Sequence, residues 1–571
     1  MPAEGEAIEV SGVHDVVVET VAIALAAATV SGVARRAGVP APIALVLAGV
    51  AASLVGVLTG ATEPQVGLDP DLVLLVFLPP LLYSAALESS YVNIRRNIRP
   101  ILQLSVGLVI FTALVVACTA HYLAGLPWSA AFVLGAVVAP PDAVAATAVG
   151  RTVGMPRRVL TILGGESLLN DATALTLFRL GLLAAAGGLS VAEGIRTTLL
   201  SALGGALIGL VLAPVVHQLR IRMTEPILEN AFALLLPFAA YVLAEAVNSS
   251  GVLAVVVLGL YLGHHEAETS FAVRLQARAV WRMLDFLLES VVFLLIGLQV
   301  PPIVRAALRL WGPWELALYG AVVIVVVIAA RYVWIYPTTY LPRWISRRLR
   351  EDNPVAWQEP AVLGWSGMRG VVSLAAALAI PQTLPAESRV LVLYLTVCVV
   401  LGTLVIHGFT LPWVIRRLGV GAGEESGDVL AEAQVQHAAA RAAVDRLDTL
   451  LAEEGEIPDG VEDRLRANAE HRANSAWERL GGGGAGMPRV RADPLEGGSA
   501  SGVEAAAEAA HRADAVPQET PAQVFRRLRR EMLDAERSVF VDMRDAGRID
   551  DEVLRRVINE LDLEEAMLTR D

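Results

Sequence analysis

The sequence of 571 residues has no lysine, two cysteines and a charged fraction of 18%. Both cysteines, Cys118 and Cys398, lie inside apolar segments, which excludes a disulfide-rich secreted scaffold. Hydrophobic residues make up 55% of the chain and its mean hydropathy is +0.56, more apolar surface than a soluble domain can bury. The apolar runs do not alternate with period two, which excludes a β-barrel. The composition therefore predicts an all-α polytopic membrane protein and excludes a soluble enzyme.

Apolar segments near the length needed to cross a bilayer recur through residues 13–420, the predicted transmembrane domain. We predict about thirteen of them, at 13–34, 40–60, 70–88, 100–124, 128–149, 159–187, 195–217, 229–247, 250–264, 280–300, 313–337, 358–381 and 387–415. Residues 1–12 contain three glutamates and no basic residue, unlike the start of a signal peptide. We expect them to form an extracellular N-terminal segment.

Arginines are distributed unevenly between the loops. Alternate loops, beginning with the one that holds Arg35 and Arg36, contain nineteen arginines, and the other loops contain four. Positive charge accumulates on the cytoplasmic side of membrane proteins. The asymmetry predicts a multi-pass protein of the cytoplasmic membrane with its N-terminus outside and its C-terminus in the cytoplasm.

Residues 421–571 form an acidic tail, with 19 arginines against 33 aspartates and glutamates. This charge argues against nucleic acid as a partner. Periodic stretches predict helices at about 428–454, 461–480, 521–546 and 550–568, with a flexible linker at about 481–518 that is rich in glycine, proline, serine and alanine. We predict a helical cytoplasmic domain, either regulatory or simply a folded tail.

The fifth apolar segment contains consecutive prolines followed by an acid. Pro140 and Pro141 remove two backbone donors, so they interrupt the helix in the middle of the membrane. Freed carbonyls persist there only beside protein or a water-filled cavity. Asp142 follows directly, and a charged side chain at this depth costs about 3 kcal/mol or more. The pattern favours an ion pathway over a simple proline kink.

The sixth segment carries four polar residues within six positions. On a helix, Ser167 and Asp171 lie on one face because they are four residues apart. Glu166 and Asn170 lie on the adjacent face for the same reason. Carboxylate, amide and hydroxyl oxygens suit Na⁺, K⁺, Li⁺ or a proton, and no thiolate or histidine completes a zinc-like set. We therefore predict an ion- and proton-binding site with no resident cofactor.

The twelfth segment contains glycines at 364, 367 and 370 around Arg369, which predicts a second interrupted helix. Segments 5 and 12 cross in opposite directions, as in transporters built from inverted repeats. Arg369 and Asp142 then neutralise opposing helix ends, a role for Asp142 that competes with direct cation binding. Glu166 requires a cationic partner, and we favour Arg331 over Arg369.

Taken together, six motifs resemble the NhaP-like sodium/proton antiporters, in the sodium/proton exchanger branch of the monovalent cation:proton antiporter superfamily. The motifs are FLPPLLY (77–83), APPDAVA (139–145), GGESLLNDATAL (164–175), VFLLIGL (292–298), WSGMRGVVSLAAALAIP (365–381) and HGFTLPWVIRRLG (407–419). The resemblance implies a homodimeric exchanger that works by alternating access and regulates intracellular pH and sodium.

It also implies residue roles. Asp171 is the ion- and proton-binding carboxylate, supported by Asn170, Ser167 and Asp142, while Glu166 pairs with Arg331. The adjacent asparagine and aspartate are typical of the electroneutral branch, which exchanges one cation for one proton. This sequence departs from many members at Pro141, where they have threonine, and at Ser84, where they have glutamate.

Two other classes of protein are weighed against an exchanger. An intramembrane aspartyl protease also needs two aspartates, but Pro141–Asp142 and Asn170–Asp171 differ from the Tyr-Asp and Gly-x-Gly-Asp contexts expected of one. An uncoupled cation channel is the alternative that the sequence excludes less firmly. The sequence predicts neither the preferred cation nor the direction of exchange.

Overall fold

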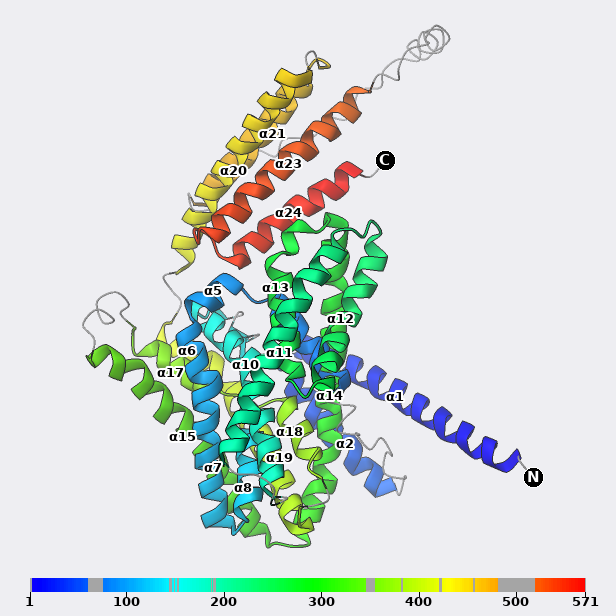
Figure 1. Ribbon diagram of the computed structural model, residues 1–571, viewed down its shortest axis with the longest axis vertical. Helices are drawn as coiled ribbons and strands as arrows, with labels where there is room; N and C mark the ends of the chain where they lie inside the picture. The colour runs from blue at the N-terminus through cyan, green and yellow to red at the C-terminus, as the bar shows by residue number, and fades with distance from the viewer. Residues whose placement is uncertain are drawn as a thin grey trace. The chain divides into compact units, whose positions relative to one another are not determined.

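The computed structural model describes residues 3–59, 75–142, 146–147, 149–150, 153–185, 187, 191–345, 355–381, 384–420, 424–454, 457–480 and 519–569. Every regular element in these ranges is a helix (Figure 1), which confirms the all-α prediction for the described residues. The chain divides into two compact units, Met1–Ala422 and Gly423–Asp571. The predicted linker at about 481–518 lies outside the described residues.

The first unit holds all of the predicted transmembrane segments. Its helices are α1 (Ala3–Ala37), α2 (Ala41–Thr59), α4 (Leu78–Leu87), α5 (Tyr91–Arg96), α6 (Ile98–Leu102), the π-helical turn η1 (Gln103–Leu108), α7 (Val109–Ala124), α8 (Trp128–Val138), α10 (Arg157–Ala185), α11 (Val191–Arg220), α12 (Pro226–Ala246), α13 (Gly251–His264), the short η2 (Glu266–Glu268), α14 (Phe271–Leu308), α15 (Pro313–Ile345), α17 (Gln358–Trp365), α18 (Val371–Leu378) and α19 (Ala386–Leu418).

Nine helices in the described residues are long and apolar enough to cross a membrane. The predicted spans at 70–88, 128–149 and 250–264 contain the shorter apolar helices α4, α8 and α13. The predicted span at 358–381 contains two short helices, α17 and α18. The count of thirteen spans therefore stays a prediction.

Helix α1 is longer than the predicted segment at 13–34, because it begins at Ala3 and continues to Ala37. The helix itself contains no proline, and it ends where Gly38 adopts a φ of +69°. That left-handed conformation suits glycine and terminates helices.

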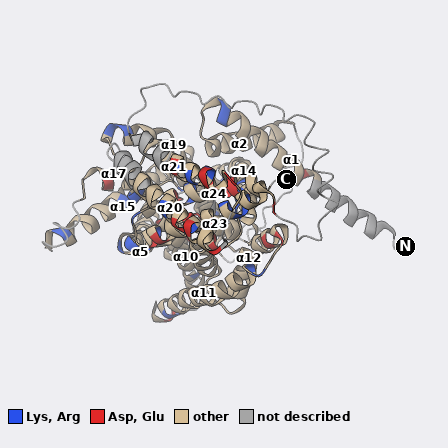
Figure 2. Cartoon of the chain, turned by 90° about the horizontal axis from the view of Figure 1, so that it is seen from above, with Lys and Arg blue, Asp and Glu red and all other residues tan. Residues whose placement is uncertain are grey.

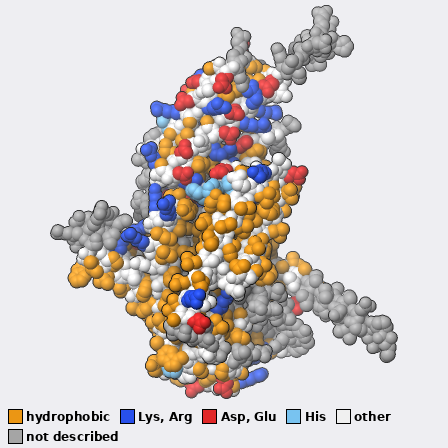
Figure 3. All heavy atoms as spheres, in the orientation of Figure 1, with side chains coloured by type: hydrophobic (Ala, Val, Ile, Leu, Met, Phe, Trp, Pro, Cys, Tyr) orange, Lys and Arg blue, Asp and Glu red, His pale blue; other side chains and the backbone are white. Residues whose placement is uncertain are grey.

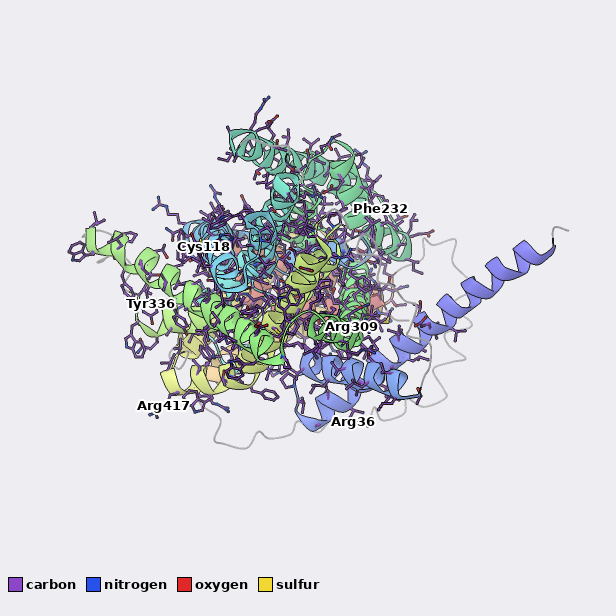
Figure 4. All side chains as sticks on the ribbon, turned by 90° about the horizontal axis from the view of Figure 1, so that it is seen from below. Arg36, Cys118, Phe232, Arg309, Tyr336 and Arg417 are labelled. Atoms are coloured by element: carbon purple, nitrogen blue, oxygen red, sulfur yellow. The ribbon has the colours of Figure 1, made fainter. Side chains whose placement is uncertain are left out.

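The outer surface of the first unit is apolar, as a lipid-facing surface must be. Leu203, Leu207 and Val211 repeat every four residues along α11 and are 61–67% exposed. Figure 3 shows apolar side chains covering much of this face. Cys118 is also exposed, on α7 (Figure 4), and both cysteines are free thiols. Exposing such an apolar stripe to water is unfavourable, so the stripe indicates contact with lipid.

Glycines allow several helices of this unit to pack closely. Gly49 on α2 lies against the backbone of Leu294 and Gly297 on α14, and a Cβ at either glycine would meet the opposite backbone within 3 Å. Gly135 on α8 lies against the carbonyl of Ala113 on α7 in the same way. Small residues let transmembrane helices approach closely enough to pack backbone against backbone.

The second unit is built from α20 (Glu424–Glu454), α21 (Val461–Leu480), α23 (Pro521–Asp545) and α24 (Asp551–Thr569). Thr520 begins α23 with a capping box in which its side chain and that of Gln523 each bond the other's backbone N–H. Figure 2 shows acidic and basic residues along these helices. Their buried faces form two apolar clusters, one that includes Leu447 and Leu528 and one that includes Leu554.

A buried network of ion pairs joins three helices of this unit. Arg529, which is fully buried, donates to Glu536 at 2.9 Å and to Glu564 at 2.7 Å, and Arg472 donates to both of the same carboxylates. Burial favours a higher pKa for Glu564, but the hydrogen bonds and charges of Arg529 and Arg472 outweigh it and hold that pKa below its usual range.

We expect Arg529→Met to destabilise the isolated tail, residues 423–571, by about 3 kcal/mol, because it removes the buried cation beside Glu536 and leaves only the more exposed Arg472 to pair with both carboxylates. Arg530→Met is the matched control, since Arg530 is the next residue and is exposed. Chemical unfolding followed by circular dichroism measures both. Equal stability of the two variants would show that the network contributes nothing.

Candidate ion-binding site

Two interruptions of helix lie against each other in the first unit. Helix α8 ends at Val138, before the two prolines, and residues 366–370 separate α17 from α18. The backbone N–H of Asp142 donates to the carbonyl of Met368 at 2.7 Å. This hydrogen bond joins the two non-helical segments, which are far apart in sequence, at one place in the structure.

Arg369 satisfies the carbonyl end of α8. Its side chain is 1% exposed, and its guanidinium donates to the carbonyls of Val138 at 3.0 Å and Ala139 at 3.3 Å, as well as to its own neighbour Gly367. The C-terminal end of a helix carries partial negative charge and unpaired carbonyls. A buried guanidinium at this position supplies both the opposite charge and the missing donors.

Asp142 lies at the start of α18. Gly370 is the N-cap residue of that helix, and a Cβ at Gly370 would clash with the Asp142 carboxylate. The carboxylate therefore occupies the space in which an N-cap side chain would stand. Because the N-terminus of a helix carries partial positive charge and unpaired N–H groups, a carboxylate is favourable there.

Helix α10 brings its polar residues to the same place. Asn170 is fully buried, and its Nδ2 donates to the carbonyl of Pro141 at 2.6 Å. Asp171 is 8% exposed, and its carboxylate lies within electrostatic reach of Asp142. Ser167, one turn earlier on the stripe of Asp171, is half-buried. The structure thus gathers Asp142, Asn170 and Asp171 around the interruption of α8.

Glu166 faces in another direction and forms a bidentate ion pair. Its two carboxylate oxygens accept from the guanidinium of Arg331 on α15 at 2.5 and 2.8 Å, and each side chain is 1% exposed. Arg331 also donates from Nε to the carbonyl of Leu363 at 2.9 Å. The pair ties α10 to α15 and α17. Arg331 and Arg369 were the two partners considered for Glu166, and in the structure Arg331 forms the ion pair.

Several residues of this region were not identified from the sequence. The hydroxyl of Thr403 on α19 accepts from the backbone N–H of Arg369 at 3.1 Å, and His407, one turn on, is 1% exposed with its ring 4.9 Å from that of Trp365. Ser84 on α4 donates to Asp285 on α14 at 2.5 Å. Asp285 could have been found from the sequence, because it is an acidic residue inside the apolar segment 280–300. Nothing in the sequence distinguishes Thr403 from other threonines.

A family model described as the transmembrane part of the sodium/hydrogen exchangers matches residues 21–417. The chain belongs to the sodium/hydrogen exchanger family. Over 559 residues it is 36% identical to an uncharacterized Na⁺/H⁺ exchanger of Mycobacterium tuberculosis, covering 96% of each chain. It is 32% identical to the Na⁺/H⁺ antiporter NhaS2 of Synechocystis, covering 84% of this chain and 85% of the relative. The chain is therefore a multi-pass membrane protein of a transporter family and not an enzyme.

The fold is similar to that of the sodium proton antiporter MjNhaP1 from Methanocaldococcus jannaschii. The match has a TM-score of 0.56 at 18% identity and covers 71% of this chain and 99% of the other. The NhaP-like identification made from the six motifs is confirmed.

Proposed function

We propose that this exchanger moves Na⁺, or K⁺ or Li⁺, across the cytoplasmic membrane in exchange for H⁺ by alternating access, with cation and proton competing for Asp171. The observation that carries the proposal is the position of Asp171, 8% exposed, beside the interruption of α8. Among the described residues no arginine lies within ion-pair distance of it, in contrast to Glu166. A carboxylate held away from water needs a positive partner, which either a proton or a dehydrated cation supplies.

The cation site that we propose consists of oxygen atoms from Asp171, Ser167 and Asp142, with Asn170 supporting it. Hard oxygen ligands suit Na⁺, K⁺ and Li⁺. No resident cofactor is needed, because the bound ion is the cargo.

The charges around this site have structural roles in the proposal. Arg369 neutralises the end of α8, and Asp142 neutralises the start of α18 while contributing an oxygen to the cation. The Glu166–Arg331 pair fixes α10 against α15. We propose that the interrupted helices cross within two inverted repeats, as transporter midplane sites do.

The stoichiometry that we propose is one cation per proton, which makes the exchange electroneutral. Asn170, next to Asp171, adds an oxygen and no second charge. If one carboxylate alternates between a cation and a proton, the site crosses the membrane with the same net charge in both directions.

The assembly that we propose is a homodimer in the cell membrane with its N-terminus outside and its acidic tail in the cytoplasm. The distribution of arginines between the loops supports this orientation. The physiological role that we propose is the regulation of intracellular pH and sodium.

The function is tested with purified protein in liposomes that contain a pH dye, under an imposed pH gradient and with the membrane voltage clamped. Pulses of Na⁺, K⁺ and Li⁺ should each report whether that cation drives proton movement, and the result should not depend on voltage. Cation flux without proton movement would instead identify an uncoupled channel.

A second prediction concerns Gly370. Gly370→Ala should reduce exchange to background, because the added methyl group would displace the Asp142 carboxylate from the start of α18. Gly164→Ala on α10 is the control, since a Cβ there has open space. Initial rates in the same liposomes measure both. Full activity of Gly370→Ala would show that the contact of Asp142 with α18 is dispensable.

A further inference from the structure

The hydroxyl of Ser373 is buried and has no hydrogen-bond partner among the described residues. Ser373 lies in the first turn of α18, and its side chain is 2% exposed. A buried hydroxyl without a partner is costly, so such groups are normally bonded to protein or to an ordered ligand.

The interruption before α18 explains why this hydroxyl has no partner within its own helix. Other buried or half-buried hydroxyls of this unit donate to the carbonyl four residues earlier: Thr176 to Ala172 at 2.6 Å, Thr396 to Val392 at 2.8 Å and Ser366 to Val362 at 2.8 Å. For Ser373 that position is Arg369, which precedes the first residue of α18. The usual acceptor is therefore not part of a helical turn.

Ser373 lies close to the proposed cation site. The Asp142 carboxylate lies where a side chain on the N-cap residue, Gly370, would stand. Ser373 is the third residue of α18, the position whose backbone N–H usually donates to an N-cap oxygen. One turn further, Ala376 and Ala377 belong to a buried apolar cluster that also contains residues of α8, α10 and α19. Residues three and four apart share a helix face. Ser373 therefore lies on a buried face of α18, in the first turn of that helix, at the end that Asp142 contacts.

A second buried oxygen at this site also lacks a partner. Asn170 donates from Nδ2 to the Pro141 carbonyl, which fixes the orientation of the amide, and its Oδ1 accepts nothing from the described residues. Two uncharged oxygens without partners among the described residues are thus buried at this site: Ser373 Oγ, in the turn of α18 that Asp142 contacts, and Asn170 Oδ1, on the residue before Asp171. A dehydrated cation satisfies such oxygens together.

We propose that Ser373 is a ligand of the transported cation and sets its affinity. The proposal rests on the proposed function and adds α18 to α8 and α10 as a source of ligands. A neutral hydroxyl can coordinate the cation through its oxygen, but it does not take up the exchanged proton. Ser373 therefore contributes to cation binding and not to proton binding. Its loss should therefore weaken cation binding and leave the proton-dependent maximal rate nearly unchanged.

The test compares Ser373→Ala, Ser373→Thr and the matched control Ser366→Ala in liposomes made from the full chain. Ser366 is equally buried and lies in the same interruption, but its hydroxyl is bonded to its own helix. Ser373→Ala should raise the apparent KM for Na⁺ about tenfold with little change in maximal rate. Ser373→Thr, which retains the hydroxyl, should recover most of the affinity, and Ser366→Ala should keep the native KM.

A binding measurement makes the result independent of transport. Na⁺ should raise the thermal unfolding temperature of the detergent-purified native chain and of Ser366→Ala, and should do so for Ser373→Ala only at about tenfold higher concentration. A native KM and a native Na⁺ dependence in Ser373→Ala would overturn the proposal. If the native chain itself shows no cation-driven proton movement, the proposed function fails, a result distinct from a failure of Ser373 alone.

Discussion

Asp171→Asn should abolish cation-driven proton movement and cation flux together. Asparagine has nearly the same shape as aspartate, but it can neither take up a proton nor carry the negative charge that a dehydrated cation requires. The protein should still fold, because Asp171 forms no ion pair among the described residues. Initial rates of pH change and of ²²Na⁺ uptake in liposomes measure the two fluxes, and both should fall to the level of empty liposomes.

The control for this prediction is Glu245→Gln. Glu245 also lies in a predicted membrane segment, but it pairs with Arg179 at 3.0 Å at a partly exposed position of α12. We expect Glu245→Gln to retain exchange. Proton-coupled transport by Asp171→Asn, at any rate well above background, would place the coupling carboxylate elsewhere.

Removing one partner of the Glu166–Arg331 pair should have the largest effect on stability. Both side chains are 1% exposed and the contact is bidentate. Arg331→Leu leaves a buried carboxylate without compensation, which typically costs about 3–5 kcal/mol. Thermal unfolding of the detergent-purified protein should show a large loss for Arg331→Leu and for Glu166→Leu.

The double variant Glu166→Leu/Arg331→Leu distinguishes this explanation from a general packing defect. It removes both charges, so it should be more stable than either single variant. Arg179→Leu, which disrupts the more exposed pair with Glu245, is the control and should have a smaller effect. Additive losses in the double variant would show that the charges do not compensate each other.

Much of the fold could be predicted from hydropathy and breaker residues alone. The predicted tail helices at about 428–454, 461–480, 521–546 and 550–568 compare with observed bounds of 424–454, 461–480, 521–545 and 551–569. Capping and proline signals are local, so the sequence defines such ends well. The start of α1 at Ala3 was missed because the predicted span followed hydropathy, and helix formation does not require apolar residues.

Asp142, Glu166 and Asp171 could be predicted as site residues, because an acidic residue inside an apolar membrane segment is costly unless it has a function or a partner. The residues that bond to these groups were harder to predict from the sequence. The guanidinium of Arg369 bonds carbonyls about 230 positions away, and Thr403 accepts a backbone N–H from the interruption before α18. Backbone carbonyls and single threonines have no compositional signature, so tertiary structure was needed to find them.

The central claim is that one carboxylate holds either the cation or the proton, and the dependence of apparent Na⁺ affinity on pH tests it most directly. Liposomes containing the native chain, with equal pH on both sides, would be assayed by ²²Na⁺ exchange at a series of pH values. Direct competition predicts that the apparent KM for Na⁺ rises as pH falls, approaching about tenfold per pH unit on the acidic side, while the maximal rate changes much less. An apparent KM that stays constant while the maximal rate follows pH would mean that proton and cation occupy separate sites, and would contradict the account.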